Sequence, residues 1–163
     1  MTTAKSYFQQ QQEFAAACGI YKGSLLSPTP VEHIRLAWNL IDEEYNKELV
    51  QELQKYLSSP SLENLVEVAD GIAGSIYVLC KLAGVIGIPL DEVFAEVQRS
   101  NMAKVVQGQV IRREDGKILK PFGWTPPNIW EVLYRAGEKE ATEKGLMGAE
   151  NWDEYIRSKK QAK

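Results

Sequence analysis

The sequence is poor in the residues that usually build zinc, redox and disulfide sites. It contains one histidine, His33, and two cysteines, Cys18 and Cys80, among 163 residues. The cysteines match no metal-ligand spacing, and a single histidine cannot build a zinc site. We therefore expect His33 to be a surface residue, and the thiols to be reduced in an intracellular protein rather than paired in a secreted one.

The sequence also lacks a strong net charge and an unbroken apolar run. Its 19 basic and 22 acidic residues give a net charge of −3, which argues against a general basic surface for nucleic acid or an anionic membrane. The longest apolar stretch, 72–90, is interrupted by polar residues, glycines and a proline, whereas a membrane span needs about 20 apolar residues. We expect this stretch to be a buried helix.

Residues 1–17 lack the apolar segment of a signal peptide, so the sequence predicts a cytoplasmic protein, or host-cytoplasmic if phage-encoded.

What is present is the composition of a globular domain, with 44% hydrophobic and 25% charged residues. Apolar spacing and capping residues predict helices over 5–18, 30–57, about 61–83, 90–105, 128–141 and 150–160. An Asp-Gly turn between β-favouring residues predicts a hairpin over 109–119. We therefore expect an all-α helical bundle in one domain, 1–163. Its core would span about 5–106, and its C-terminal extension, about 107–163, would hold the small β-hairpin and short helices. Residues 9–12, all glutamine, are interpreted as the solvated face of the first helix.

Two acids interrupt the otherwise apolar helix over 61–83. Glu67 and Asp70 are three residues apart and therefore share one face. Burial of an unpaired carboxylate costs several kcal/mol, so each acid needs a cation, a donor or a proton. Gly71 and Gly74 continue this face and would leave room for a metal and a phosphate. The alternative is a salt bridge to a cation from elsewhere, because Lys81 is wrongly spaced along the helix.

The preceding helix supplies more acids. Glu44 and Glu48 are four residues apart beside its apolar stripe. If the two helices pack antiparallel, four carboxylates would meet and repel one another unless a divalent cation lay between them. Oxygen ligands without a cysteine or histidine cluster indicate Mg²⁺ or Mn²⁺. The alternative is a solvated face on which Glu43, Glu44 and Glu48 form local ion pairs with Lys47 and Lys55.

The pattern Glu43-Glu44-x-x-x-Glu48 followed by Glu67-x-x-Asp70 resembles the E-E-x-x-E and E-x-x-D motifs of the all-α NTP pyrophosphatases. These are the MazG-like and phosphoribosyl-ATP pyrophosphohydrolase-like proteins. Further segments resemble a subgroup common in phages and bacteria, and the similarity extends from about Phe8 to Ile129. These segments are Leu40-Ile41-Asp42-Glu43-Glu44, Val68-Ala69-Asp70, Ile76-Tyr77-Val78, Gly87 to Phe94, Arg99-Ser100-Asn101-Met102-x-Lys104, Asp115 to Pro121 and Pro126-Pro127.

The resemblance implies hydrolysis of an NTP between its α and β phosphates, which gives a nucleoside monophosphate and pyrophosphate. Glu44, Glu67 and Asp70, with one more acid of the first motif, would bind Mg²⁺. The metal would clamp phosphate oxygens and activate a water, and one carboxylate would take the proton. Asn101 and Lys104 would hold the triphosphate or the sugar.

Two positions depart from the family pattern. The last acid of the strict first motif falls at Lys47, and we expect the adjacent Glu48 to substitute for it. A further aspartate that commonly follows the second motif is replaced by Gly74. This replacement leaves open the number of metals and the shape of the nucleotide pocket.

The resemblance also bears on substrate and assembly. The subgroup includes phage (d)GTP pyrophosphatases, so guanine nucleotides rank first, with dUTP, dCTP and modified nucleotides left open. Phe14 and Trp38 are candidates for stacking on the base, as are Tyr77 and Trp124, although plain core packing is the alternative for each. Family members form homodimers or homotetramers, since helices with two apolar sides need partners. The other hypotheses are a non-catalytic helical protein that binds a nucleotide or a partner at a degenerate site, and phosphoribosyl-ATP hydrolysis.

Overall fold

The computed structural model describes residues 4–146, and this part of the chain is mostly helical (64%) with no β-strand, which confirms the all-α class. The chain divides into two compact units, Met1–Leu90 and Asp91–Lys163, which are described separately. This division falls within the core that the sequence predicts over 5–106. The helix predicted over 150–160 lies outside the described residues.

The first unit contains a long helix that the sequence predicts as one element over 30–57. It consists of α2 (Val31–Ile41), η1 (Asp42–Leu49) and α3 (Val50–Ser58), which follow one another without a break. The middle segment η1 is a π-helix, in which each N–H bonds five residues back. Apolar spacing does not distinguish this wider turn from an α-helix. The π-helical segment contains all the acids of the first predicted motif.

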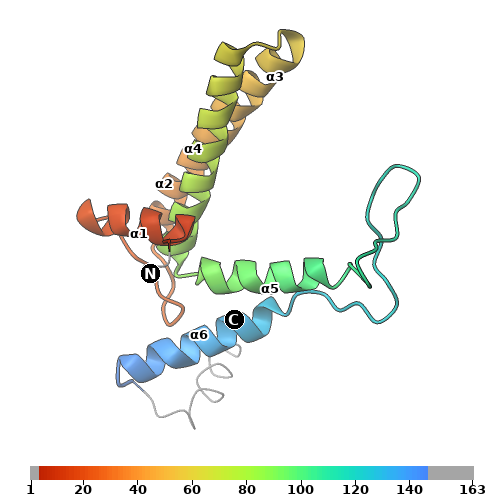
Figure 1. The fold of residues 1–163 in the computed structure, drawn as a ribbon. Helices are drawn as coiled ribbons and strands as arrows, with labels where there is room; N and C mark the ends of the chain where they lie inside the picture. Colours follow the sequence, from red (N-terminus) through yellow and green to blue (C-terminus); the bar gives the residue numbers. More distant parts are fainter. Residues whose placement is uncertain (1–3, 147–163) are drawn as a thin grey trace. The chain divides into compact units, whose positions relative to one another are not determined.

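Helix α4 (Leu62–Ile86) returns beside this long helix (Figure 1) and packs against α1 (Tyr7–Ala17), α2, η1 and α3. Ser61 caps its N-terminus, and the Ser61 Oγ accepts a hydrogen bond from the Asn64 N–H at 3.1 Å. It ends at Gly87 with a φ of 85°, a left-handed conformation that favours glycine. The loop after α1 is attached to this end, because the Gly23 N–H donates to the Gly84 carbonyl at 2.9 Å.

One side of α4 is buried and the other is exposed. The sequence predicts a buried helix, which holds for only one side of α4 in the single chain because the neighbouring helices cover only part of it. Its exposed large apolar side chains are Leu62, Leu65, Val66, Ile72, Ile76, Tyr77 and Leu79. By length and composition alone, α4 could also cross a membrane, since an 18-residue window has a mean hydropathy of 1.5 and 39% of it is buried.

The second unit contains α5 (Leu90–Met102), which begins at the boundary, and α6 (Ile129–Glu143). Hydrogen bonds attach the segment before α6 to α5. The buried Ser100 hydroxyl donates to the Thr125 carbonyl at 3.0 Å, and the Trp124 Nε1–H donates to the Ser100 carbonyl at 2.8 Å. The Asn128 N–H donates to the Glu96 carboxylate at 2.7 Å. These contacts position Trp124 beside the C-terminal end of α5.

The connection between α5 and α6 reverses direction at Gly116, where φ is 85°. Two backbone hydrogen bonds of 2.8 Å join its arms, from the Arg113 N–H to the Lys117 carbonyl and from the Leu119 N–H to the Ile111 carbonyl. An isolated antiparallel bridge forms between Arg112 and Ile118. No strand forms in this described segment, so the β-hairpin over 109–119 stays a prediction.

Candidate acidic site on the helical hairpin

The carboxyl group of Glu44 lies against Gly74 in the structure. A Cβ at position 74 would overlap Glu44 Oε2 and lie 3.2 Å from Glu44 Cδ. A Cβ at Gly71 would lie 3.0 Å from the Leu49 Cα. The sequence predicts room for a metal and a phosphate beside the acids on this face, and that stays a prediction. At the two glycines themselves, Glu44 and Leu49 fill the space that a Cβ would take, so the glycines allow η1 to approach α4 closely.

Glu44 is the acid whose electrostatic environment is most informative. Burial raises the pKa of its carboxyl group above the usual value, and the negative charges of Glu48, Glu43 and Asp70 raise the pKa further. The structure therefore brings Glu44 within electrostatic range of two acids of its own segment and of Asp70 on α4. Glu67 lies one helical turn from Asp70 and is not among the groups that shift the pKa of Glu44.

The acids lie at a more exposed surface than the sequence predicts. Glu44 is half-buried, whereas Glu48, Glu67 and Asp70 are exposed, because the adjoining apolar face of α4 is uncovered in the single chain. Within residues 4–146 no three histidine, cysteine or acidic side chains are arranged to hold one metal ion together. The single chain thus supplies carboxylates on two neighbouring helical segments but not a preassembled coordination sphere.

Nearby lysines do not neutralise these acids. Lys47 lies 3.4 Å from Asp42 Oδ2, and Lys55 pairs with Glu52. A hydrogen bond from Asn46 and the charge of Lys47 lower the pKa of Asp42. In the described part of the chain, no lysine or arginine forms an ion pair with Glu44, Glu48, Glu67 or Asp70. The local ion pairs that the sequence suggests do form, but with different acids.

The aromatic candidates of the first unit are exposed. Phe14 makes an edge-to-face contact with Tyr77, with ring centroids 5.9 Å apart, and is 52% exposed. Trp38 on α2 is 65% exposed. A groove of about 320 Å³ between α1 and α4 includes Ala69, which directly precedes Asp70, and Ala73, one helical turn further along. These aromatic side chains and the groove are available to a ligand. His33 is different, because its ring stacks on Tyr21 with the ring centroids 4.2 Å apart.

Asn101 and Lys104 lie together in the second unit. Lys104 Nζ donates to Asn101 Oδ1 at 2.7 Å and lies 5.8 Å from the centroid of Trp124. Lys120 Nζ lies 4.1 Å from the same centroid. Residues 99–124 contain six basic residues against two acidic ones, so this segment suits an anion although the whole chain is acidic. Sequence analysis missed Lys120, which the local excess of positive charge could have indicated.

Gln11 is the second residue that sequence analysis missed. Its side chain is 0% exposed, so the interpretation of the glutamine run as a solvated face is wrong for this residue. Four consecutive helical residues span about 300° around the axis, so they cannot all lie on one face. Helix α1 packs on α4, and at least one glutamine must therefore point inward.

No family model and no curated protein matches this chain. The arrangement of the acids and the resemblance of the sequence motifs are therefore the grounds on which a function can be argued.

Proposed function

We propose that this protein is a Mg²⁺-dependent nucleoside triphosphate pyrophosphohydrolase, which converts an NTP or dNTP to the monophosphate and pyrophosphate. The best candidate substrates are dGTP and GTP. The observation that supports the proposal most is the position of Glu44, which contacts Gly74 of a neighbouring helix among three other carboxylates. Unpaired like charges at close range raise the free energy of the folded protein, and a divalent cation would relieve this repulsion.

The chemistry of the donor set fits the metal. Glu44, Glu48, Glu67 and Asp70 offer only carboxylate oxygens, which suit Mg²⁺ or Mn²⁺ better than a softer ion. When bound, Mg²⁺ supplies Lewis-acid activation of a phosphate and lowers the pKa of a water. The carboxylates would hold the ion, and one of them would accept the proton of the attacking water.

The proposal gives further residues a role in substrate binding. The ammonium group of Lys104 would neutralise phosphate charge, and Asn101 holds that ammonium group in position through its 2.7 Å hydrogen bond. Phe14 and Trp38 expose aromatic faces that suit a base.

The direct test is pyrophosphate release from a panel of all NTPs and dNTPs with and without Mg²⁺. Glu67→Gln and Asp70→Asn keep the side-chain shape and remove the charge, so both should abolish release. Glu52→Gln is the matched control, because Glu52 pairs with Lys55 and lies outside the acidic site. Full turnover in both site variants would contradict the proposal.

A second candidate function is a non-catalytic protein that binds a nucleotide or a partner helix. The observation that favours it is Gly74, which stands where the family that the motifs resemble commonly has a further aspartate and whose side-chain space Glu44 fills. A thermal-shift screen separates the two functions. Stabilisation by a nucleotide that requires Mg²⁺ supports the enzyme, whereas insensitivity to both supports the alternative.

We also propose that the chain assembles as a homodimer or a homotetramer. Leu36 and Trp38 on α2, Leu57 on α3 and the outer side of α4 expose apolar surface that a partner helix could cover. Light scattering on the purified protein should give two or four times the mass of one chain, and a monomeric mass would contradict this part of the proposal.

A further inference from the structure

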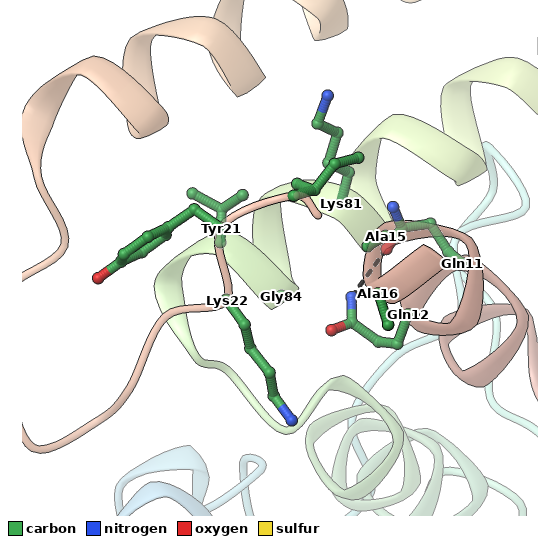
Figure 2. A pocket seen from close by; sticks show the side chains of 10 residues that line it. Gln11, Gln12, Ala15, Ala16, Tyr21, Lys22, Lys81 and Gly84 are labelled. Carbon is green, nitrogen blue, oxygen red and sulfur yellow. Dashed lines mark hydrogen bonds between the residues drawn. The ribbon is translucent and has the colours of Figure 1, made fainter. Parts of the chain in front are cut away.

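Pairs of lysines in the two units differ in whether their ammonium groups converge. In the first unit, Lys22 and Lys81 line a small cavity between α1 and α4, and their side chains extend in opposite directions (Figure 2). In the second unit, Lys104 Nζ and Lys120 Nζ lie 5.8 and 4.1 Å from the centroid of the same ring, that of Trp124. These two ammonium groups are therefore no further apart than the sum of the two distances, and an extended anion can reach both.

The ring beside these lysines is held in place by local structure. The Trp124 Nε1–H donates to the Ser100 carbonyl at 2.8 Å, near the C-terminal end of α5. The Trp124 backbone N–H donates to the Pro121 carbonyl at 3.1 Å, which closes a tight turn with Gly123 at a φ of 77°. Lys120 directly precedes this turn, so the reversal of the chain brings its side chain back over the ring.

Lys104 approaches the same ring from the end of α5. Its backbone N–H donates to the Asn101 carbonyl at 3.1 Å, and its ammonium group donates to Asn101 Oδ1 at 2.7 Å. The amide oxygen of Asn101 is neutral, so it orients the ammonium group without cancelling its charge. Lys104 and Lys120 thus reach Trp124 from opposite ends of the connection that links them.

These two lysines differ from their basic neighbours in having no acidic partner. Arg99 pairs with Glu96, and Arg113 pairs with Asp115. Within residues 4–146 no carboxylate forms an ion pair with either lysine at the Trp124 ring. A cation–π contact at an exposed site stabilises a lysine only weakly, so it leaves most of the repulsion between the two charges in place. An anion with several negative charges would relieve that repulsion.

We propose that Lys104 and Lys120 together bind the di- or triphosphate group of the nucleotide substrate or of the pyrophosphate product. The identity of these two ligands rests on the proposed function. A single phosphate is compact, whereas a chain of two or three phosphates distributes its charge over a greater length and can contact both ammonium groups. Lysine binds phosphate as a point charge with three rotatable donors, so the two lysines can follow a flexible phosphate chain. Lys120 is the residue that this proposal adds to the substrate-binding set.

The test is calorimetric titration of the full chain with inorganic pyrophosphate and inorganic phosphate in metal-free buffer. Pyrophosphate should bind about tenfold more tightly than phosphate, because it contacts a second charged donor. Lys104→Met and Lys120→Met should each weaken pyrophosphate binding about tenfold. Lys120→Arg keeps the charge and should retain most of the affinity. Lys117→Met is the matched control, because it removes the same charge from the same segment but not from the Trp124 ring.

Titration with GTP in the same metal-free buffer distinguishes the two sources of the phosphate group. If both lysine variants also weaken GTP binding, the site binds the substrate. If they weaken only pyrophosphate binding, the site binds the released product. Either result supports a site for a di- or triphosphate group.

Further measurements distinguish this role from a structural one. Lys120 is exposed, so Lys120→Met should leave the melting temperature nearly unchanged. Pyrophosphate affinity should fall as salt rises, because salt screens exposed charges. Three results would each overturn the inference: equal pyrophosphate binding by Lys120→Met and the natural protein, no preference for pyrophosphate over phosphate, or a loss in Lys117→Met as large as that in Lys120→Met.

The outcomes also separate this inference from the proposed function. Binding of pyrophosphate without metal involves no hydrolysis, so it is measured independently of the enzyme activity. Lysine-dependent pyrophosphate binding by a protein that hydrolyses no NTP would overturn the proposed function and leave the phosphate site intact. Mg²⁺-dependent hydrolysis with an unchanged KM in both Lys104→Met and Lys120→Met would overturn the phosphate site and leave the enzyme intact.

Discussion

Glu44 in the first unit and Glu96 in the second are both glutamates of helical segments, yet their environments shift the pKa in opposite directions. Glu96 accepts hydrogen bonds from Arg99 at 2.7 and 2.8 Å and from the Asn128 N–H, and these lower its pKa to about 2. Burial and neighbouring carboxylates raise the pKa of Glu44. The charge of Glu96 therefore stabilises the fold, whereas the charge of Glu44 opposes it.

Other described acids show the same contrast. In the second unit, Glu131 pairs with Arg135 and Glu140 with Lys144, each four residues apart on α6. In the first unit the nearby lysines pair with Asp42 and Glu52, and the four predicted metal ligands have no such partner within residues 4–146. The difference teaches that acids left without local cations are the better candidates for binding an external one.

The largest effect that could break this comparison is expected for Glu44→Gln. If Glu44 is a metal ligand, its loss should reduce Mg²⁺-dependent pyrophosphate release about a hundredfold or more, since even residues that only support a ligand commonly cost 10- to 100-fold. Steady-state assays across a Mg²⁺ titration would measure the change. Glu52→Gln is the control, and equal activity of the two variants would place Glu44 with the structural acids.

The next effect concerns the two glycines that let η1 approach α4. Gly71→Ala would press a methyl group against the Leu49 backbone, which cannot move aside, and should lower the free energy of unfolding by about 1–3 kcal/mol. Gly74→Ala meets the flexible Glu44 side chain instead and gains about 1 kcal/mol of helix propensity, so its stability should stay near that of the natural protein.

Urea unfolding of both variants would measure this difference. Gly74→Ala should also weaken stabilisation by Mg²⁺, because the new methyl group would displace the Glu44 carboxyl group from its position against α4. A loss of stability at Gly74→Ala as large as that at Gly71→Ala would show that Glu44 is held rigidly.

A smaller effect on stability is expected from Glu96 at acidic pH. Because its folded pKa is about 2 and the ordinary value is 4.5, its contribution to stability is fully present above pH 4.5 and is lost as pH falls toward 2. Melting temperatures measured between pH 6 and pH 2 should therefore fall less steeply for Glu96→Gln, which starts from a lower value. Parallel curves for the two proteins would contradict the assignment.

The smallest effect is expected for Glu44→Gln without metal. Because the folded pKa of Glu44 is raised, the folded state binds its proton more readily, and stability should decline as pH rises through the titration of this group. The variant should therefore be slightly more stable than the natural protein at neutral pH, by less than about 1 kcal/mol for a group so accessible to solvent. Mg²⁺ should reverse the order, and thermal unfolding with and without the ion would measure it. A destabilised metal-free variant would contradict the sign.

Several elements follow from local sequence alone. The spacing of apolar residues predicts the helices of 30–57 and 90–105, and Ser61 caps α4 because capping depends on a few adjacent residues. The same helix extends to Ile86, beyond the end that the sequence predicts near residue 83. Pairs such as Glu131 and Arg135 follow from positions one turn apart. The π-helical geometry of η1 does not follow in this way, since the same apolar stripe suits either helix type.

The amino-acid sequence by itself determined where the helices lie and which acids share a helix face, because these properties depend on residues within one or two turns. Only the tertiary structure decided that Glu44 contacts Gly74, that Gln11 is buried and that one side of α4 is exposed. The free energy of a charge or an amide depends on what a distant segment places beside it, and local spacing contains no information about that segment.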